Sequence, residues 1–189
     1  MRLVPLTINR QPDPTIWVVD NFYSDPYAVR EFALQQEFKP QKEYFKGSRS
    51  VEQFFLPGTK QAFEKIMGIK IREWESHGMC GRFQFCTAED DLVYHNDGQK
   101  WAAMLYLTPD APYNTGTSLY ASKNTGSRYG SPDAFTGGFY DDTKFDLVDS
   151  VGNVFNRLFI FDAQNIHAAS KYFGQTKEDS RLFHIFFFD

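Results

Sequence analysis

Tyr94-His95-Asn96-Asp97-Gly98, close to the middle of the 189-residue chain, is the stretch that decides the fold. Side chains on an extended segment alternate between its two faces, so His95 and Asp97 project from the same face and can both reach one metal ion. A third ligand is expected from a distant histidine, and Asn165-Ile166-His167-Ala168 supplies it after an apolar run. Two histidines and one carboxylate on one side of a metal leave further coordination positions open. The alternative is that Asp97-Gly98 only closes a loop, because Asn-Asp-Gly is a common turn sequence.

Alternation of polar and apolar residues predicts antiparallel strands around this stretch. Gly81-Arg82-Phe83-Gln84-Phe85-Cys86-Thr87 alternates as a half-buried strand does. Further strands are expected over residues 15–19, 51–55, 101–107, 118–121, 155–161 and 182–188. Residues 39–50 are polar and are expected to form a loop.

Two helices are expected before most of these strands. Ser24-Asp25-Pro26 combines capping side chains with a proline at a first helical position, which predicts a helix over residues 26–37. Leu56-Pro57-Gly58-Thr59 precedes a second helix, over residues 60–67, that ends at Gly68. Residues 122–145 are rich in Gly, Ser, Asn, Asp and Tyr and lack apolar periodicity, which is typical of an active-site lid.

Composition excludes several classes of partner. The net charge of −4 argues against a broad nucleic-acid-binding face, and no run is long and apolar enough to span a membrane. The N-terminal residues lack the apolar core and cleavage site of a signal peptide.

If the segment between Cys80 and Cys86 is extended, their Cα atoms lie about 20 Å apart, too far for a disulfide. Free thiols predict a reducing, cytoplasmic location.

Four residues together carry a family resemblance. His95, Asp97, His167 and Arg181, in that order, resemble the 2-oxoglutarate/Fe(II)-dependent oxygenases, and most of all their prolyl-hydroxylase-like branch. The resemblance covers roughly residues 82–188, and it implies that the two histidines and the carboxylate hold Fe(II) as a facial triad.

The resemblance extends to the strand that follows the His-x-Asp pair. Trp101-Ala102-Ala103-Met104-Leu105-Tyr106-Leu107-Thr108 matches the run at that place in prolyl-hydroxylase-like enzymes. It implies that Met104 and Tyr106 point inward, with the Tyr106 hydroxyl on the distal carboxylate of 2-oxoglutarate. Leu119, just after Gly116-Thr117, would wall the same pocket. Ordinary core packing is the alternative for each of these three side chains.

Arg181 shares a face of its expected strand with apolar side chains that look like barrel filling. An unpaired guanidinium there would cost several kcal/mol in lost hydration, so an anionic group is expected to meet it. Its planar fork suits a carboxylate held bidentately, and the resemblance implies that this is the co-substrate. The alternative is an arginine at the edge of the strand that reaches solvent or pairs with Glu178 or Asp179.

The expected fold is mainly β with flanking helices. Short helices followed by many antiparallel strands point to a double-stranded β-helix, the jelly-roll, cupin-like barrel of this family. From spacing alone a β-sandwich is nearly as good, and the triad favours the barrel. We expect one domain over residues 1–189, with a helical and strand entry at 1–80, a barrel core at 81–189 and the lid at 122–145.

The predicted function is that of an Fe(II)- and 2-oxoglutarate-dependent dioxygenase that uses O2 to hydroxylate an unactivated C–H bond. The resemblance implies decarboxylation of 2-oxoglutarate to succinate. The substrate would be a residue of a peptide or protein, with proline suggested by the branch resembled, or a small molecule. The alternatives are a non-catalytic, cupin-like metal- or ligand-binding module and a sugar-modifying cupin enzyme without 2-oxoglutarate. His77 and His184 are predicted to be structural.

Overall fold

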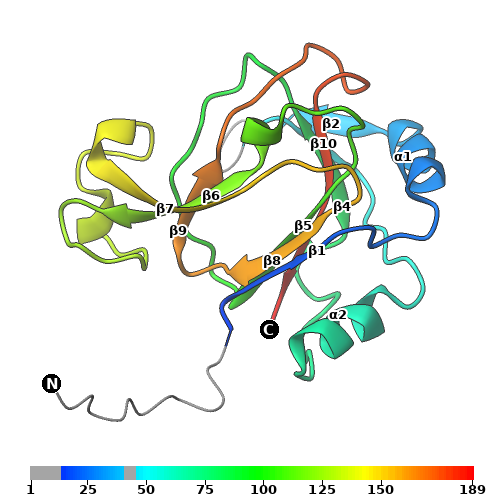
Figure 1. Ribbon diagram of the computed structural model, residues 1–189, viewed down its shortest axis with the longest axis horizontal. Coiled ribbons are helices and arrows are strands. Elements are labelled where there is room, and N and C mark those ends of the chain that lie inside the picture. The colour runs from blue at the N-terminus through cyan, green and yellow to red at the C-terminus, as the bar shows by residue number, and fades with distance from the viewer. Residues whose placement is uncertain (1–13, 41–45) are drawn as a thin grey trace, which may run out of the picture.

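The computed structural model describes residues 14–40 and 46–189, and these ranges form ten β-strands, two α-helices and three short 3₁₀ helices (Figure 1). The strands are β1 (Ile16–Val19), β2 (Phe38–Pro40), β3 (Ser48–Ser50), β4 (Arg82–Cys86), β5 (Trp101–Tyr106), β6 (Thr117–Ser122), β7 (Phe145–Val151), β8 (Leu158–Asp162), β9 (Ile166–Ala169) and β10 (Arg181–Phe188). The helices are α1 (Pro26–Leu34), α2 (Thr59–Met67), η1 (Tyr113–Thr115), η2 (Asp133–Phe135) and η3 (Asp142–Lys144).

The strands form two antiparallel sheets. Within the described ranges the large sheet has seven strands in the order β1-β8-β5-β10-β4-β3-β2, and the small sheet has three in the order β7-β6-β9. Strands β5 and β10 pair at the centre of the large sheet, with Met104 opposite Ile185. The small sheet stands on the side of the large sheet away from the two α-helices (Figure 1).

Alternate side chains of β10 pack on opposite faces of the large sheet, as a period of two requires. Its odd-numbered apolar side chains lie in a cluster with Phe159 and Phe161 of β8 and with Leu119 of β6, so this core fills the space between the sheets. Its even-numbered apolar side chains pack under the helices, where the ring centroid of Phe186 lies 5.2 Å from that of Phe63 in α2. Each such burial stabilises the fold by about 1.5–3 kcal/mol.

The two α-helices begin and end where local chemistry dictates. The Asp25 carboxylate accepts a hydrogen bond from the Ala28 backbone N–H, and Pro26 occupies the first turn, where no amide donor is needed. Helix α2 ends at Gly68, whose φ of +70° is favourable for glycine. Both predicted helices are therefore confirmed, the first of them shorter than expected.

Two expectations for residues 39–55 are wrong. Ser48–Ser50 lies in the predicted loop but forms strand β3, and residues 51–55 are not a strand. The side chains of Phe54 and Phe55 both pack against the core under the helices, so the segment does not alternate as a strand would. Residues 41–45 of the predicted loop lie outside the described residues.

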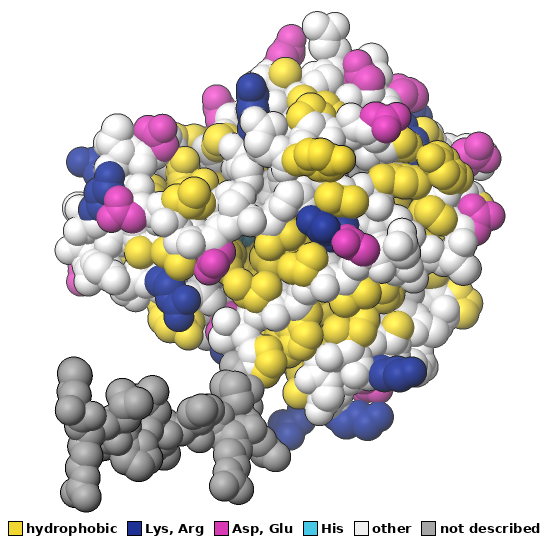
Figure 2. Space-filling model, in the orientation of Figure 1, with side chains coloured by type: hydrophobic (Ala, Val, Ile, Leu, Met, Phe, Trp, Pro, Cys, Tyr) yellow, Lys and Arg dark blue, Asp and Glu magenta, His cyan; other side chains and the backbone are white. Residues whose placement is uncertain are grey.

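The surface carries both signs of charge. Figure 2 shows Lys and Arg interspersed with Asp and Glu over the visible face, as the small net charge suggests. Within the described residues, no helix has the length and apolar character needed to cross a membrane. The two cysteines, both buried, are free thiols as predicted.

Candidate metal centre

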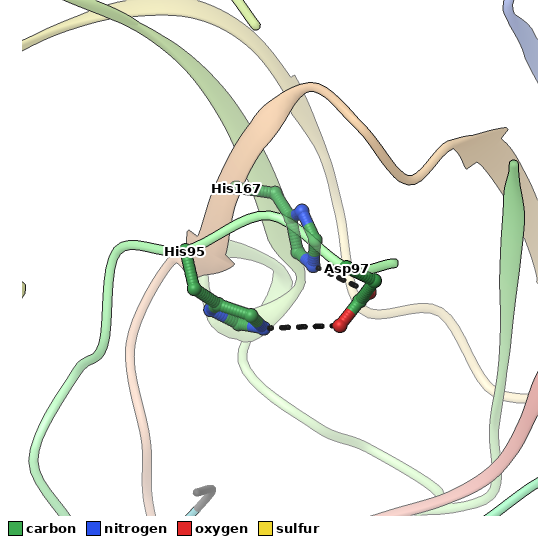
Figure 3. Close-up of side chains that lie close together, drawn as sticks. All are labelled: His95, Asp97 and His167. Atoms are coloured by element: carbon green, nitrogen blue, oxygen red, sulfur yellow. Dashed lines mark ion pairs between the residues drawn. The ribbon is translucent and has the colours of Figure 1, made fainter. Parts of the chain in front are cut away.

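A short backbone bridge brings the two predicted histidine ligands together. His95 and His167 of β9 exchange two N–H···O=C bonds, with N–O distances of 3.0 and 2.8 Å. The Asp97 N–H donates to the carbonyl of Ala163 at 2.8 Å, which fixes the carboxylate beside them. The three side chains point toward one another, and one ligand atom of each lies within 4.8 Å of the others (Figure 3).

The aromatic residue before His95 holds this segment against the small sheet. The Tyr94 ring is buried and stacks on Phe145 of β7, with ring centroids 4.6 Å apart. Its backbone N–H donates to the carbonyl of Phe139 at 2.8 Å. Burial of one aromatic ring thus anchors the strand-like segment whose next residue faces the site.

The remaining ring nitrogens show how the histidines are oriented. Nδ1 of His95 lies 2.9 Å from the carbonyl oxygen of Val93, and Nδ1 of His167 lies 2.9 Å from that of Asn165. A carbonyl oxygen only accepts, so each Nδ1 carries a proton and each ring turns its Nε2 toward Asp97. Such bonds to the far nitrogen are the usual support of a metal-binding histidine.

The arrangement lacks a positive partner at its centre. Nε2 of His95 lies 3.9 Å from Oδ1 of Asp97, and Nε2 of His167 lies 3.4 Å from Oδ2. Oδ2 is buried and accepts no hydrogen bond from the described residues. A buried carboxylate oxygen without a donor is costly, and one divalent cation would satisfy it together with the two Nε2 atoms. The residues present therefore fit a metal ion.

Protonation at neutral pH also suits a metal. Desolvation, assisted by the neighbouring His167, lowers the pKa of His95 to about 4. Burial by itself raises the pKa of Asp97, but the two histidines and Arg49 outweigh it, so the pKa lies below the usual value. The site thus presents neutral His95 and ionised Asp97, the forms that bind a cation.

A cavity of about 460 Å³ opens beside the three ligands, within the size range of small-molecule sites. It is lined by Arg49, His77, Met79, His95, Asn96, Asp97, Gly98, Gln99, Ala102, Met104, Phe161, His167, Ile185 and Phe187. Apart from Met79, the apolar part of this wall comes from strands β5, β8 and β10. A rigid sheet therefore forms the floor against which a substrate would lie.

Arg181, at the start of β10, points into the core between the sheets and is 1% exposed. Its guanidinium donates to the carbonyl oxygens of Thr115 (2.8 Å) and Gly116 (3.2 Å) and to the Thr117 hydroxyl (2.9 Å). Gly116 is needed here, because a Cβ would lie 1.9 Å from the carbonyl oxygen of Val151. Among the described residues no carboxylate lies within 4.0 Å of Arg181, which is buried, so the alternative that it reaches solvent or pairs with Glu178 or Asp179 is wrong.

The three predicted pocket residues lie near this arginine or near the metal site. The Tyr106 hydroxyl donates to Thr117 Oγ1 at 2.9 Å, and its ring centroid lies 5.3 Å from the Arg181 guanidinium carbon. Met104 lines the metal cavity, and Leu119 pairs with His167 across β6 and β9. All three side chains lie in the core between the sheets, which is compatible with a place in the co-substrate pocket and with ordinary core packing.

The other two histidines differ from each other. His184 lies on the opposite face of β10 from Arg181, where Nδ1 is 2.9 Å from the Tyr23 hydroxyl and Nε2 is 3.0 Å from the Phe54 carbonyl. It is structural, as predicted. His77 lines the metal cavity but stands outside the three-ligand group.

Arg49 of β3 also lines the cavity, and the sequence analysis did not predict it. It lies in the stretch expected to be a loop, and no motif surrounds it. Only the pairing of β3 with β4 brings it to the site.

Comparisons with known proteins find this fold among oxygenases. HygX from Streptomyces hygroscopicus, solved with nickel, 2-oxoglutarate and hygromycin B bound, aligns with a TM-score of 0.62 at 11% identity over 92% of this chain and 82% of its own. A Trichoplax adhaerens prolyl hydroxylase, in complex with a hypoxia inducible factor oxygen degradation domain peptide fragment, aligns at 0.57 with 13% identity over 93% and 84%. A Pseudomonas putida prolyl-4-hydroxylase aligns at 0.52 with 13% identity over 92% and 91%.

Sequence comparison adds no relative. No family model matches the chain, and no curated protein matches it significantly. At the low identities of the structural matches, the shared property is the fold: a mainly β chain with two helices and antiparallel sheets.

Proposed function

We propose that this chain is an Fe(II)- and 2-oxoglutarate-dependent dioxygenase that hydroxylates an unactivated C–H bond and converts 2-oxoglutarate to succinate and CO2. The observation that carries the proposal is the Asp97 carboxylate: its buried Oδ2 accepts no hydrogen bond from the described residues, and its two oxygens lie 3.4 and 3.9 Å from Nε2 of His167 and His95. Its support is the fold, which is that of solved 2-oxoglutarate/Fe(II) oxygenases. In this proposal the two sheets are the two sides of a double-stranded β-helix.

His95, Asp97 and His167 would hold the iron. Iron held there would supply the redox chemistry that joins 2-oxoglutarate to O2. The protein keeps both imidazoles in one tautomer through the carbonyls of Val93 and Asn165. These bonds hold the rings in place before the metal arrives.

Arg181 would bind the distal carboxylate of 2-oxoglutarate. The described groups that it contacts through hydrogen bonds are neutral carbonyl, hydroxyl and thioether groups, so these bonds leave its positive charge uncompensated. Burial raises the pKa of Tyr106, which keeps its hydroxyl protonated and able to donate to the same carboxylate. Met104 and Leu119 would provide the apolar walls around the methylene groups.

The substrate class in this proposal is a peptide residue or a small molecule. Both kinds occur among the structural matches, as the peptide fragment bound to the Trichoplax enzyme and the hygromycin B bound to HygX. The cavity beside the metal ligands has room for one residue or one small molecule.

The test is succinate release. Given Fe(II), 2-oxoglutarate and a reductant in air, the protein should form succinate slowly without substrate and faster with a member of a panel of amino acids and peptides. The Asp97→Ala variant is the control, because it removes one metal ligand. Succinate no higher than in that control, with every substrate tried, would favour a non-catalytic metal-binding module.

A further inference from the structure

Arg49 lines the candidate metal cavity, but it is not one of the three candidate metal ligands, and the proposed co-substrate contacts do not include it. The described lining contains two residues of the types Asp, Glu, Lys and Arg, namely Asp97 and Arg49. Asp97 is a candidate metal ligand. Arg49 lies in the middle of β3, is 7% exposed, and has its guanidinium carbon 5.7 Å from the Phe187 ring centroid. A cation is thus built into the wall where a substrate would lie.

The pairing of β3 with β4 sets the direction of this side chain. Arg49 stands opposite Gln84 on β4, and its Nε–H donates to the Gln84 side-chain oxygen at 2.5 Å. Gln84 is held in turn, because its amide nitrogen donates to the carbonyl of Lys46 at 2.9 Å. Residues directly opposite in a sheet share a face, so the arginine is aimed by its cross-strand neighbour.

Arg49 also lines a second, smaller cavity of about 130 Å³. Arg49 and Met79 line both cavities, and the small one is also lined by Lys39 and Arg82, with no acidic side chain in its described lining. Three basic side chains, Lys39, Arg49 and Arg82, therefore line the small cavity. Burial lowers the pKa of Arg49 to about 10, which leaves it charged at neutral pH.

We propose that Arg49 binds a carboxylate of the primary substrate and so sets the substrate class. A guanidinium lining a desolvated cavity recognises a carboxylate through charge-assisted bonds, whereas a neutral amide lacks that charge. The substrate is then a free amino acid or another small carboxylic acid, with its reacting C–H bond toward the metal ligands. An internal residue of a peptide has no carboxylate of its own main chain to offer. This inference rests on the proposed function and narrows it.

The test compares acids with their amides. The probes are matched pairs of small carboxylic acids and free amino acids with their primary amides, added to protein loaded with Ni(II) and saturating 2-oxoglutarate, which prevents turnover. Saturation-transfer NMR should detect at least one acid that binds about tenfold or more tightly than its amide, the difference expected of one charge-assisted bond. Equal binding of acids and amides, or no acid bound at all, would overturn the proposal.

Substitutions assign the preference to Arg49. Arg49→Gln should abolish the preference for acids, and Arg49→Lys, which keeps the charge and favours folding, should retain only part of it. Lys39→Gln is the matched control, because it removes the same charge from an exposed side chain of the small cavity and should leave the preference intact. A preference that persists in both Arg49 variants would contradict the assignment.

Co-substrate affinity separates this inference from the proposed function. The affinity for 2-oxoglutarate, titrated before any probe is added, should be unchanged in Arg49→Gln. If it falls about tenfold or more, Arg49 binds the co-substrate and the present proposal is wrong. If the unsubstituted protein binds neither metal nor 2-oxoglutarate, it is the proposed function that fails.

Discussion

At the scale of single residues, Arg181 gives the sharpest test of co-substrate binding. In Arg181→Leu the distal carboxylate of 2-oxoglutarate loses a desolvated partner, which costs about 3–5 kcal/mol, or roughly two to four decades in affinity. Metal binding should survive, because no hydrogen bond joins the guanidinium to a metal ligand. Arg181→Lys should fall between, since a point charge replaces only part of the fork.

The measurement is a titration of 2-oxoglutarate into the anaerobic Fe(II) form, followed by the metal-to-ligand charge-transfer band. Thermal unfolding of each variant provides the control, because Arg181 also donates to the carbonyls of Thr115 and Gly116. A folded Arg181→Leu protein that binds 2-oxoglutarate as tightly as the parent would exclude the clamp.

His184 predicts how stability depends on pH. Burial lowers its pKa in the folded protein to about 4, against about 6.5 in an unfolded chain. Between these values the unfolded chain binds a proton that the folded protein does not, so stability is lost as the pH falls from 6.5 toward 4. From pH 7 to pH 5 the loss should be about 2 kcal/mol from this residue.

Urea unfolding of metal-free protein at these two pH values measures the loss. His184→Gln should lose about 2 kcal/mol less than the parent over the interval. The contribution of His95 is common to both proteins and cancels in the difference. An equal pH dependence in parent and variant would mean that His184 is not held neutral by its burial.

The residues of the site were predictable to different degrees. The order of His95, Asp97 and His167 along the chain predicted that they come together, because two lie on one extended segment and the third follows an apolar strand, and the structure groups them as candidate metal ligands. Arg49 was not predictable, since its part in the cavity depends on the pairing of a three-residue strand in a polar stretch.

At the scale of elements, residues 122–145 remain the predicted lid. The Arg128 carbonyl and the Gly130 N–H bond to Ile166 and Gln164 at 2.7 and 3.0 Å, which ties the segment beside β9 and the metal ligands. The described lining of the metal cavity contains no residue of this segment. With few buried apolar anchors, it should open at low free-energy cost.

Limited proteolysis tests this element. Cleavage should begin within residues 122–145, and it should slow when metal and 2-oxoglutarate are bound. Cleavage elsewhere in the described chain, such as between α1 and α2, serves as the internal reference. Equal resistance of the segment with and without ligands would count against a mobile cover.

Strands with many buried apolar residues were predicted from the sequence, and strands with mostly exposed residues were not. Strand β10 was predicted because all eight of its residues are buried and its apolar side chains are large. Strand β7 was missed because five of its seven residues are exposed, so it carries no apolar alternation. Residues 51–55 were wrongly predicted as a strand, because they contain apolar side chains. Of these, Phe54 and Phe55 pack against the core under the helices without any strand pairing.

At the scale of the whole molecule, the mainly β architecture with two helices was predictable from the order of the elements. The relation between the sheets was not, because spacing alone fits a β-sandwich nearly as well as a barrel. The candidate site depends on long-range pairing within and beside the small sheet, because β9 brings His167 opposite Leu119 of β6 and opposite His95. Such contacts are invisible to local sequence patterns.

The metal centre is the claim on which the rest depends, and anaerobic Fe(II) titration with equilibrium dialysis tests it most directly. The parent protein should bind one Fe(II) per chain, and Mn(II), Co(II) or Zn(II) should compete for the same site. His95→Ala and His167→Ala should each lose most of this affinity. His77→Ala should bind Fe(II) like the parent, because His77 lines the cavity without belonging to the ligand group. Parent-like affinity in both ligand variants would contradict the assignment.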